Sequence, residues 1–274
     1  MRFVSFNING LRARTHQLDQ LINKLQPDVL GLQETKVHND LFPIKKIKKY
    51  GYHVYYDGQK QYHGVALFLK KLPLIVTRGF PLNPCPYQKR IITAQITTSI
   101  GSLTVINGYF PQGENNQSEK FIYKKQFYQN LKNYIQNNYS NESLLLIMGD
   151  MNISPTDLDV GIGKKNTDRW IKMGKCAFLP EERQWITDLM NWGLIDIYRS
   201  KYPYQNNRYS WFSYQSNGFK NNRGLRIDLV LVTQPLAHLC TCSGINYDIR
   251  NMTHPSDHAP IWVDLDIEYD VSTK

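Results

Sequence analysis

The sequence predicts an α/β fold in one domain, because short apolar segments alternate with amphipathic ones along its 274 residues. Apolar runs of about four to eight residues are typical of buried strands. Apolar residues that recur every three or four positions are typical of helices packed on a sheet. No repeat, low-complexity tract or long linker divides the chain. We therefore expect residues 1–274 to form a single domain, with one or two sheets covered by helices.

The first half of the chain begins with a strand over residues 2–8, which ends near Asn7. A helix follows, with apolar side chains on one face at Leu18, Leu21, Ile22 and Leu25. Pro27 ends this helix, because the residue before a proline disfavours helical backbone. A buried strand over 29–32 then delivers Gln33 and Glu34 at its carboxyl end. Further strands are predicted at residues 52–56, 65–69, 91–97 and 103–109.

The second half combines two long helices with four strands. A helix over Glu119–Asn138 presents Phe127, Leu131, Tyr134 and Ile135 on one face. An apolar strand over 144–148 follows. Pro180 opens another helix, since proline and the acids after it suit a first turn, and Gly193 stands where this helix should end. The remaining strands are predicted at residues 208–214, 227–232 and 261–267, and polar loops at 111–118, 154–170 and 201–207.

The chain is basic, with 33 Lys and Arg against 23 Asp and Glu and a formal net charge of +10. Such a charge favours a polyanionic partner, although lysines scattered over a solvated surface would give the same number. The longest apolar run near mid-chain, 144–148, is far shorter than a membrane helix, and neither a secretory segment nor a dense disulfide pattern is present. We therefore expect a cytoplasmic protein with reduced cysteines and no membrane association.

Polar side chains gather at the ends of the predicted strands, where sites form in α/β sheets. Any one of them alone could be a helix cap or a turn residue. Together they supply several carboxylates and amides, a tyrosine and a histidine, which suits Mg²⁺ chemistry on a phosphate because Mg²⁺ prefers oxygen ligands. The chain lacks the G-x-S-x-G elbow, the Walker loop and the H-E-x-x-H zinc signature, which leaves hydrolysis or transfer at a phosphoester. The residues concerned are Asn7, Asn9, Glu34, Tyr109, Asp150, Asn152, Asp228, Asp257 and His258.

Seven motifs resemble those of the exonuclease III family, the abasic-site endonucleases of the endonuclease/exonuclease/phosphatase superfamily. They are FNINGLRAR (6–14), LQETKVH (32–38), YHGVAL (62–67), VINGYFPQGE (105–114), LIMGDMNISPTDLD (146–159), NNRGLRIDL (221–229) and PSDHAPIW (255–262). They occur in the family's order and span residues 2–265, whereas the tail at about 268–274 lies outside the resemblance. The resemblance implies a DNase I-like four-layer sandwich, in which two face-to-face mixed β-sheets are flanked by helices.

The resemblance also implies a metal site. Glu34 would be the principal metal-ligating carboxylate, and Asn7 would support both the metal and the scissile phosphate. Asp257 would hold the metal site together. Asp150 would orient or deprotonate the attacking water, with Asn152 beside it. The expected ion is Mg²⁺, with Mn²⁺ as a substitute; whether one ion or two take part, and which group is the general base, stay open.

Three further residues receive catalytic roles from the resemblance. Asp228 and His258 match a pair in which the carboxylate fixes the imidazole tautomer and raises its pKa. A protonated His258 can then hydrogen-bond a phosphate oxygen as negative charge builds. Tyr109 would contact the phosphate or stabilise the leaving group. Taken alone, Asp228 could cap a turn and His258 could be an ordinary core histidine.

Two groups of residues match positions that bind DNA in the family. Trp211, Leu225 and Ile227 correspond to an apolar wall that receives a flipped abasic sugar, although Trp211 could also be strand core. Extruding such a sugar costs less than extruding an intact nucleotide, because it has no base to unpair or unstack. The second group would contact the DNA backbone without reading sequence; it comprises Arg90, Gln112, Asn222 and Arg223.

The implied activity is an Mg²⁺-dependent phosphodiesterase that incises double-stranded DNA 5′ to abasic sites and removes nucleotides 3′→5′ from duplex ends, acting as a monomer. A phospholipid or inositol phosphatase of the same superfamily and a catalytically idle DNA-binding module are the alternatives. The positive charge and the 221–229 motif argue against the first. The presence of Glu34, Asp150, Asp228 and His258 argues against the second. We expect the excess positive charge to concentrate around the Asp150–His258 cleft.

Overall fold

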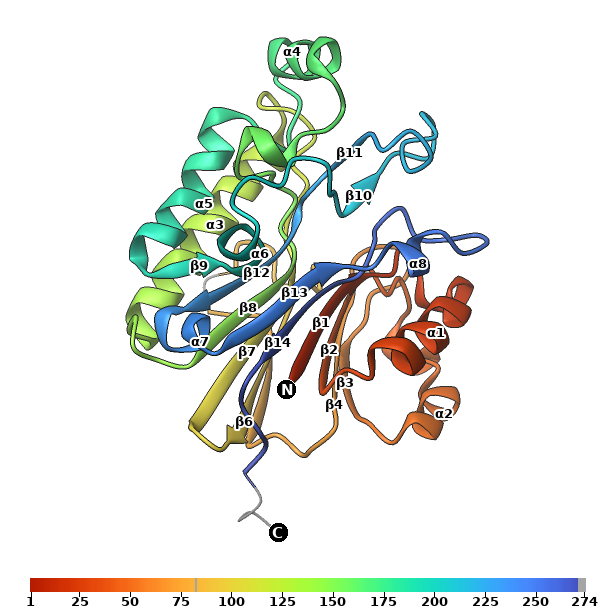
Figure 1. The fold of residues 1–274 in the computed structure, drawn as a ribbon, viewed down its shortest axis with the longest axis vertical. Coiled ribbons are helices and arrows are strands. Elements are labelled where there is room, and N and C mark those ends of the chain that lie inside the picture. Colours follow the sequence, from red (N-terminus) through yellow and green to blue (C-terminus); the bar gives the residue numbers. More distant parts are fainter. Residues whose placement is uncertain (82, 271–274) are drawn as a thin grey trace.

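The computed structural model describes residues 1–81 and 83–270. Two six-stranded mixed sheets pack face to face, and helices cover their outer faces (Figure 1). The expected four-layer α/β sandwich is therefore confirmed. Of the tail that the resemblance leaves unexplained, residues 271–274 lie outside the described residues. None of the helices in the described ranges has the length and hydropathy needed to span a lipid bilayer.

The first sheet has the strand order β13-β14-β1-β2-β4-β3. Only β1 and β2 pair in parallel; the other neighbours are antiparallel. Helices α1, α2 and α8 contribute apolar side chains to the layer on its outer face. The bounds are β1 (Arg2–Asn7), α1 (Thr15–Leu25), β2 (Val29–Gln33), α2 (Ile44–Ile47), β3 (His53–Asp57), β4 (Val65–Leu69), β13 (Cys240–Ile245), α8 (Tyr247–Arg250) and β14 (Ile261–Leu265).

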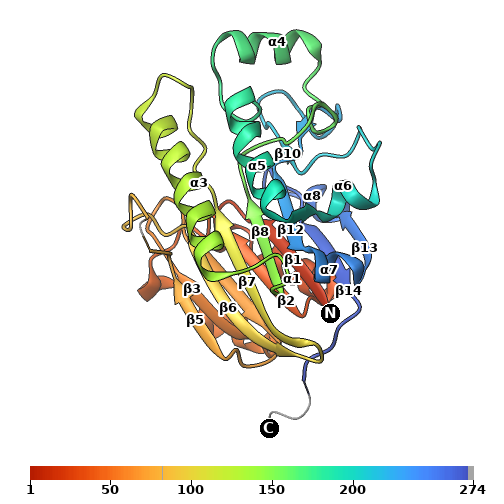
Figure 2. The same cartoon turned by 90° about the vertical axis from the view of Figure 1, so that its left-hand side faces the viewer.

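The second sheet has the order β5-β6-β7-β8-β12-β9, with β7 and β8 as its parallel pair. Helices α3 and α5 lie together on its outer face (Figure 2). The bounds are β5 (Ile75–Arg78), β6 (Ile91–Thr98), β7 (Gly101–Tyr109), α3 (Glu119–Asn138), β8 (Leu145–Asp150), α5 (Pro180–Trp192), β9 (Leu194–Asp196), α6 (Ile197–Lys201), β12 (Asp228–Thr233) and α7 (Gln234–His238).

A smaller unit stands beyond one end of the two sheets (Figures 1 and 2). It contains α4 (Lys164–Lys172) and the two-stranded sheet formed by β10 (Trp211–Phe212) and β11 (Gly224–Leu225). Short 3₁₀ helices occur at Leu11–Ala13, Asn39–Leu41, Lys48–Tyr50 and Asp157–Asp159.

The core between the sheets explains why the central strands are apolar on both sides. In β2, Val29 packs between the sheets while Leu30 and Leu32 face the helices. A strand covered on both faces needs apolar residues at every position. Gly31 lets the sheets approach closely, because a Cβ there would lie 2.4 Å from Oδ1 of Asn107 in the opposite sheet. Asn107 donates from its amide to the carbonyls of Leu32 and Ala66, so it joins the two layers.

Several sequence-based expectations are wrong in detail. The strand predicted at 208–214 contains only the two residues of β10, and the loop predicted at 154–170 contains a 3₁₀ helix and most of α4. Strands β5, β9 and β13 were not predicted. Strand β5 is largely exposed and β13 reads CTCSGI, so neither has the apolar pattern of a buried strand. The helix that opens at Pro180 and is capped by Gly193 is confirmed.

Candidate active site

The carboxyl ends of both parallel strand pairs meet at one edge of the sandwich. Asn7 ends β1, Tyr109 ends β7 and Asp150 ends β8, while Glu34 follows β2 directly. Strands β7 and β8 approach closely just before Asp150, where Gly108 is paired with Gly149. A Cβ on Gly149, which has φ +154°, would lie 1.9 Å from the carbonyl oxygen of Gly108, so only glycine permits this approach. The predicted convergence of strand ends is therefore present.

Left-handed backbone redirects several side chains at these strand ends. Asn9, Glu34 and Asn152 have φ values of +46°, +49° and +53°. Non-glycine residues adopt this conformation at a cost and are found in it preferentially at functional sites. Each of the three follows a strand end by one or two residues, so the turn points its side chain into the same region.

The side-chain amide of Asn7 joins two carboxylates. Its Nδ2 donates to Oε1 of Glu34 at 2.9 Å and to Oδ2 of Asp150 at 2.8 Å. Its Oδ1 accepts from the backbone N–H of Asn9 at 3.0 Å, which fixes the amide orientation. These two hydrogen bonds hold the carboxylates close together across the interface between the sheets, and the Asn7 side chain that makes them is fully buried.

The histidine–aspartate pair lies against the same carboxylates. The antiparallel register of β8 and β12 sets Asp228 opposite Asp150. Nδ1 of His258 lies 2.8 Å from Oδ2 of Asp228, and Nε2 lies 3.7 Å from Oδ2 of Asp150. Burial opposes the charged imidazolium, but Asp228 and Asp150 outweigh it and raise the pKa of His258 to about 10. The imidazolium is therefore the favoured form at neutral pH.

The carboxyl group of Asp150 is poised near neutrality. Burial raises its pKa to about 7, and the negative charges of Asp228 and Glu34 act in the same direction, while His258 opposes them. A buried carboxylate with such a pKa can exchange a proton with water at physiological pH. Asn152 steadies this carboxylate, because its backbone N–H donates to Oδ1 of Asp150 at 3.0 Å.

The donor set suits a hard divalent cation. Glu34, Asp150 and His258 each offer a ligand atom within 4.8 Å of the other two. His258 is favoured as the imidazolium, which has a proton on both ring nitrogens, so the carboxylate oxygens of Glu34 and Asp150 are the candidate ligands for Mg²⁺. Asp257, predicted to support the metal, lines the same pocket as Glu34 and Asp150 and accepts hydrogen bonds from Asn9 at 2.8 Å and from Nε1 of Trp211 at 2.9 Å.

Tyr109 and Arg90 stand beside the carboxylates. The Arg90 guanidinium lies 4.9 Å from the ring centroid of Tyr109 and donates to the Tyr109 carbonyl oxygen at 3.1 Å. Burial, reinforced by the charge of Glu34, raises the pKa of the Tyr109 phenol well above its usual value. The phenol is therefore neutral at physiological pH, and it donates a hydrogen bond to the Glu34 carboxylate.

A pocket of about 240 Å³ opens directly onto this cluster, and we call it the small pocket. Trp211, Leu225 and Ile227 form an apolar wall opposite the carboxylates. Trp211 and Leu225 are directly paired in the β10–β11 ribbon. The other lining residues are Glu34, Tyr109, Gln112, Asp150, Asn152, Trp170, Lys175, Cys176, Ala177, Asp257 and His258.

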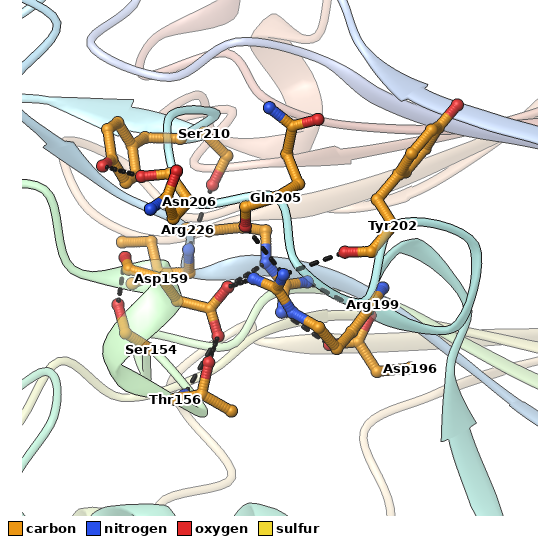
Figure 3. A network of polar contacts seen from close by, with 12 residues as sticks. Ser154, Thr156, Asp159, Asp196, Arg199, Tyr202, Gln205, Asn206, Ser210 and Arg226 are labelled. Atoms are coloured by element: carbon orange, nitrogen blue, oxygen red, sulfur yellow. Dashed lines mark hydrogen bonds and ion pairs between the residues drawn. The ribbon is translucent and has the colours of Figure 1, made fainter.

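A buried charge network is centred on Arg226 (Figure 3). Arg226, between wall residues Leu225 and Ile227, donates from Nε to Asp159 at 2.6 Å and from Nη2 to Asp196 at 2.7 Å. The three charged side chains of Arg226, Asp159 and Asp196 are almost completely buried. These residues are not among those expected from the sequence, although Arg226 lies inside the 221–229 motif.

Two further buried groups tie the site together. The Ser210 hydroxyl accepts from the backbone N–H groups of Ile227 and Asp228 at 3.1 and 3.0 Å. Lys124, in α3, pairs with Glu182 of α5 at 2.5 Å and donates to the carbonyl of Asn152 at 2.9 Å. No periodic pattern in the sequence marks them.

The predicted DNA-backbone residues are distributed around the pocket. Gln112 lines the small pocket and Arg90 packs on Tyr109. Arg223 lines a neighbouring hollow of about 500 Å³, the large pocket, together with Arg169 and Lys175 of the α4 region. Asn222 is exposed, lines neither pocket, and donates to the carbonyl of Asn207 at 3.1 Å.

Comparison with known proteins gives a consistent result. Residues 4–258 match the model of the Endonuclease/Exonuclease/phosphatase family. The chain is 54% identical over 266 residues to exodeoxyribonuclease III of Haemophilus influenzae, covering 97% of this chain and 100% of that protein. Its fold is similar to a 3′-5′ exonuclease from Neisseria meningitidis, with a TM-score of 0.88, 34% identity, and 97% and 100% of the chains covered. It is also similar to an AP endonuclease from Archaeoglobus fulgidus, with a TM-score of 0.88, 31% identity, and 97% and 99% covered.

Proposed function

The chain belongs to the endonuclease/exonuclease/phosphatase family, and we propose that it is an Mg²⁺-dependent DNA-repair phosphodiesterase of the exonuclease III type. It incises duplex DNA 5′ to abasic sites, leaving a 3′-hydroxyl and a 5′-deoxyribose phosphate, and removes nucleotides 3′→5′ from duplex ends. One observation carries the proposal: the Asn7–Glu34–Asp150 cluster and the His258–Asp228 pair open onto a small pocket with an apolar wall.

Proton transfer to Asp150 activates the water that attacks phosphorus in line. Its carboxylate has a pKa near neutrality, so it can take the proton of the attacking water. Asn7 and the backbone of Asn152 fix the direction in which the carboxylate oxygens point. Positioning of this kind lowers the barrier because the reacting groups need no reorganisation at the moment of attack.

His258 and Tyr109 stabilise the charge that develops on the phosphate. Asp228 engages Nδ1 of His258, which leaves the Nε2–H of the imidazolium as the donor to a phosphate oxygen. The neutral phenol of Tyr109 offers a second donor from the end of β7. Preorganised donors of this kind are worth more in a buried site than in water.

Glu34, with Asn7 supporting it, is the residue that would hold Mg²⁺, and Asp150 lies close enough to orient a water beside the ion. When bound, the ion supplies positive charge that polarises a phosphate oxygen and offsets the repulsion between substrate and carboxylates. Mn²⁺ should substitute because it accepts the same oxygen ligands.

The small pocket accounts for the choice of an abasic nucleotide. An apolar wall of Trp211, Leu225 and Ile227 suits a sugar that has lost its base, and a pocket of about 240 Å³ can receive such a sugar. Around it, Arg90, Gln112, Asn222 and Arg223 would contact the backbone of double-stranded DNA, so binding should weaken as salt rises. We expect the enzyme to be cytoplasmic, since its four cysteines are unpaired, and to act as a monomer, as the family resemblance implies.

Incision of an abasic-site duplex tests the proposal. The wild-type protein should cleave on the 5′ side of the lesion with Mg²⁺ and lose this activity with a chelator. Asp150→Asn should abolish incision, whereas Asp157→Asn, the same change at an exposed aspartate, should not. Absence of metal-dependent incision, or full activity in Asp150→Asn, would contradict the proposal. Faster turnover of phosphoinositide or inositol phosphate head groups than of DNA would favour the phosphatase alternative.

A further inference from the structure

Lys175 lies at the junction of the two pockets, since it lines both of them. Its backbone is held from two sides. Its N–H donates to the carbonyl of Trp170 at 2.9 Å, and the N–H of the next residue, Cys176, donates to the carbonyl of Glu114 at 3.1 Å. The position of this side chain is therefore set by the fold and not by a free loop.

The Lys175 side chain lies against an aromatic ring that also lines both pockets. Its Nζ lies 3.7 Å from the ring centroid of Trp170, and that ring is stacked on Phe178 with an interplanar angle of 6°. The ammonium makes no hydrogen bond or ion pair with any residue in the described part of the chain. Burial, assisted by the positive charge of Arg169, lowers its pKa, so a larger fraction is neutral than for an exposed lysine.

Nothing in the hydrolytic mechanism uses this amine. We propose that Lys175 forms an imine with the ring-opened aldehyde of an abasic deoxyribose seated in the small pocket, a covalent reaction that needs no metal. The inference rests on the proposed function, because it requires an abasic sugar in that pocket. The sugar of an abasic site interconverts between a closed hemiacetal and an open chain whose C1′ is an aldehyde, and primary amines react with such aldehydes.

The reaction balances without an added oxidant or reductant. The lone pair of Nζ attacks C1′ and forms the carbon–nitrogen bond. The carbonyl oxygen takes up the two protons of the amine and leaves as water, so that C1′ becomes doubly bonded to nitrogen. Water reverses the step and returns the free amine and the aldehyde. Borohydride, added only in the test, reduces the imine to a stable secondary amine and makes the link permanent.

Trapping with borohydride tests the proposal on the full chain. The protein is mixed with an abasic-site duplex in a chelator, so that phosphodiester hydrolysis is suppressed, and borohydride is added. We expect a covalent protein–DNA adduct whose cross-linked peptide maps to Lys175 by mass spectrometry. A duplex that carries a tetrahydrofuran analogue has no aldehyde and should give no adduct.

Two variants separate chemistry from charge. Lys175→Arg keeps the positive charge but should lower the adduct yield by more than about tenfold, because arginine stays protonated. Lys172→Ala removes an exposed lysine three residues away in α4 and should leave the yield unchanged. Thermal unfolding of Lys175→Arg establishes that it is folded.

Three outcomes would overturn the proposal: no adduct, an adduct that maps to another residue, or an undiminished yield in folded Lys175→Arg. Loss of duplex affinity in Lys175→Ala that is restored in Lys175→Arg, without any adduct in the wild type, would show that Lys175 only binds phosphate. Failure of the proposed function would appear separately, as absence of Mg²⁺-dependent incision of the tetrahydrofuran duplex.

Discussion

Replacing Asp228 by asparagine removes one charge from a buried pair and leaves the size of the side chain unchanged. In the wild-type protein Nδ1 of His258 lies 2.8 Å from Oδ2 of Asp228, and both side chains are buried. Asparagine can still accept a hydrogen bond from Nδ1. Its neutral amide does not stabilise the imidazolium, so the pKa of His258 should fall toward its ordinary value.

The size of the effect follows from the protonation of His258. Despite burial, Asp228 and Asp150 raise its pKa from 6.5 to about 10, and each power of ten corresponds to about 1.4 kcal/mol. The whole rise in the pKa of His258 therefore corresponds to at most about 5 kcal/mol of stability, and several carboxylates contribute to it. We expect Asp228→Asn to lower the free energy of unfolding by about 2–4 kcal/mol. Because the folded-state pKa is the higher one, this contribution is fully present below about pH 6.5 and is lost as the pH rises toward about 10.

Urea unfolding of both proteins in a chelator, from about pH 6 to about pH 10, measures the difference in stability. The difference in the free energy of unfolding between wild type and variant should be largest near the acidic limit of this range and should decrease as the pH rises. Incision at neutral pH should fall by about 10²- to 10⁴-fold in kcat, as when an amide replaces the carboxylate that orients a catalytic histidine. A stability gap that does not change with pH, or an undiminished kcat, would refute the reasoning.

Three other substitutions probe the site and its support. Lys124→Met leaves the buried carboxylate of Glu182 unpaired and should lower the free energy of unfolding by about 3–5 kcal/mol in a urea titration. Adding Glu182→Gln removes that charge and should recover part of the loss; no recovery would mean that the charge is not the cause. Asn7→Ala removes the amide shared by two carboxylates and should lower the incision rate by about 10- to 100-fold, measured across an Mg²⁺ titration. Trp211→Ala widens the small pocket, so the ratio of kcat/KM for abasic over intact duplex should fall, and an unchanged ratio would remove Trp211 from the specificity wall.

The strongly patterned elements could be predicted from the sequence. The helices beginning at residues 119 and 180 and the buried central strands have clear apolar periodicity, and they form as expected. The prediction of a strand over 208–214 was wrong. Only two residues of this region form a strand, and the aromatic side chain of Trp211 lines a pocket. Strand β13 depends on pairing with β14, which no local pattern reveals.

The polar residues of the site could be identified as a group, but not their contacts. Strand ends at residues 7, 34, 109 and 150 predict convergence, and the structure brings these side chains together. Arg226, Lys124 and Lys175 could not be found in this way, because a basic residue in a sequence is an exposed charge unless the fold buries it. Asn222 is exposed, as a residue that contacts the DNA backbone must be, but the sequence does not show that its side chain donates to the carbonyl of Asn207.

Strand β1 lies between β2 and β14, so its two neighbours come from opposite halves of the chain. During synthesis β1 can meet β2 early, but its other edge stays unpaired until residues 261–265 have left the ribosome. Asn7, Glu34 and Asp150 emerge first, while the imidazole at position 258 arrives only shortly before β14. A ribosome-bound chain that has not yet released residues 258–265 therefore carries an incomplete site, and cutting can begin only after this segment has been made.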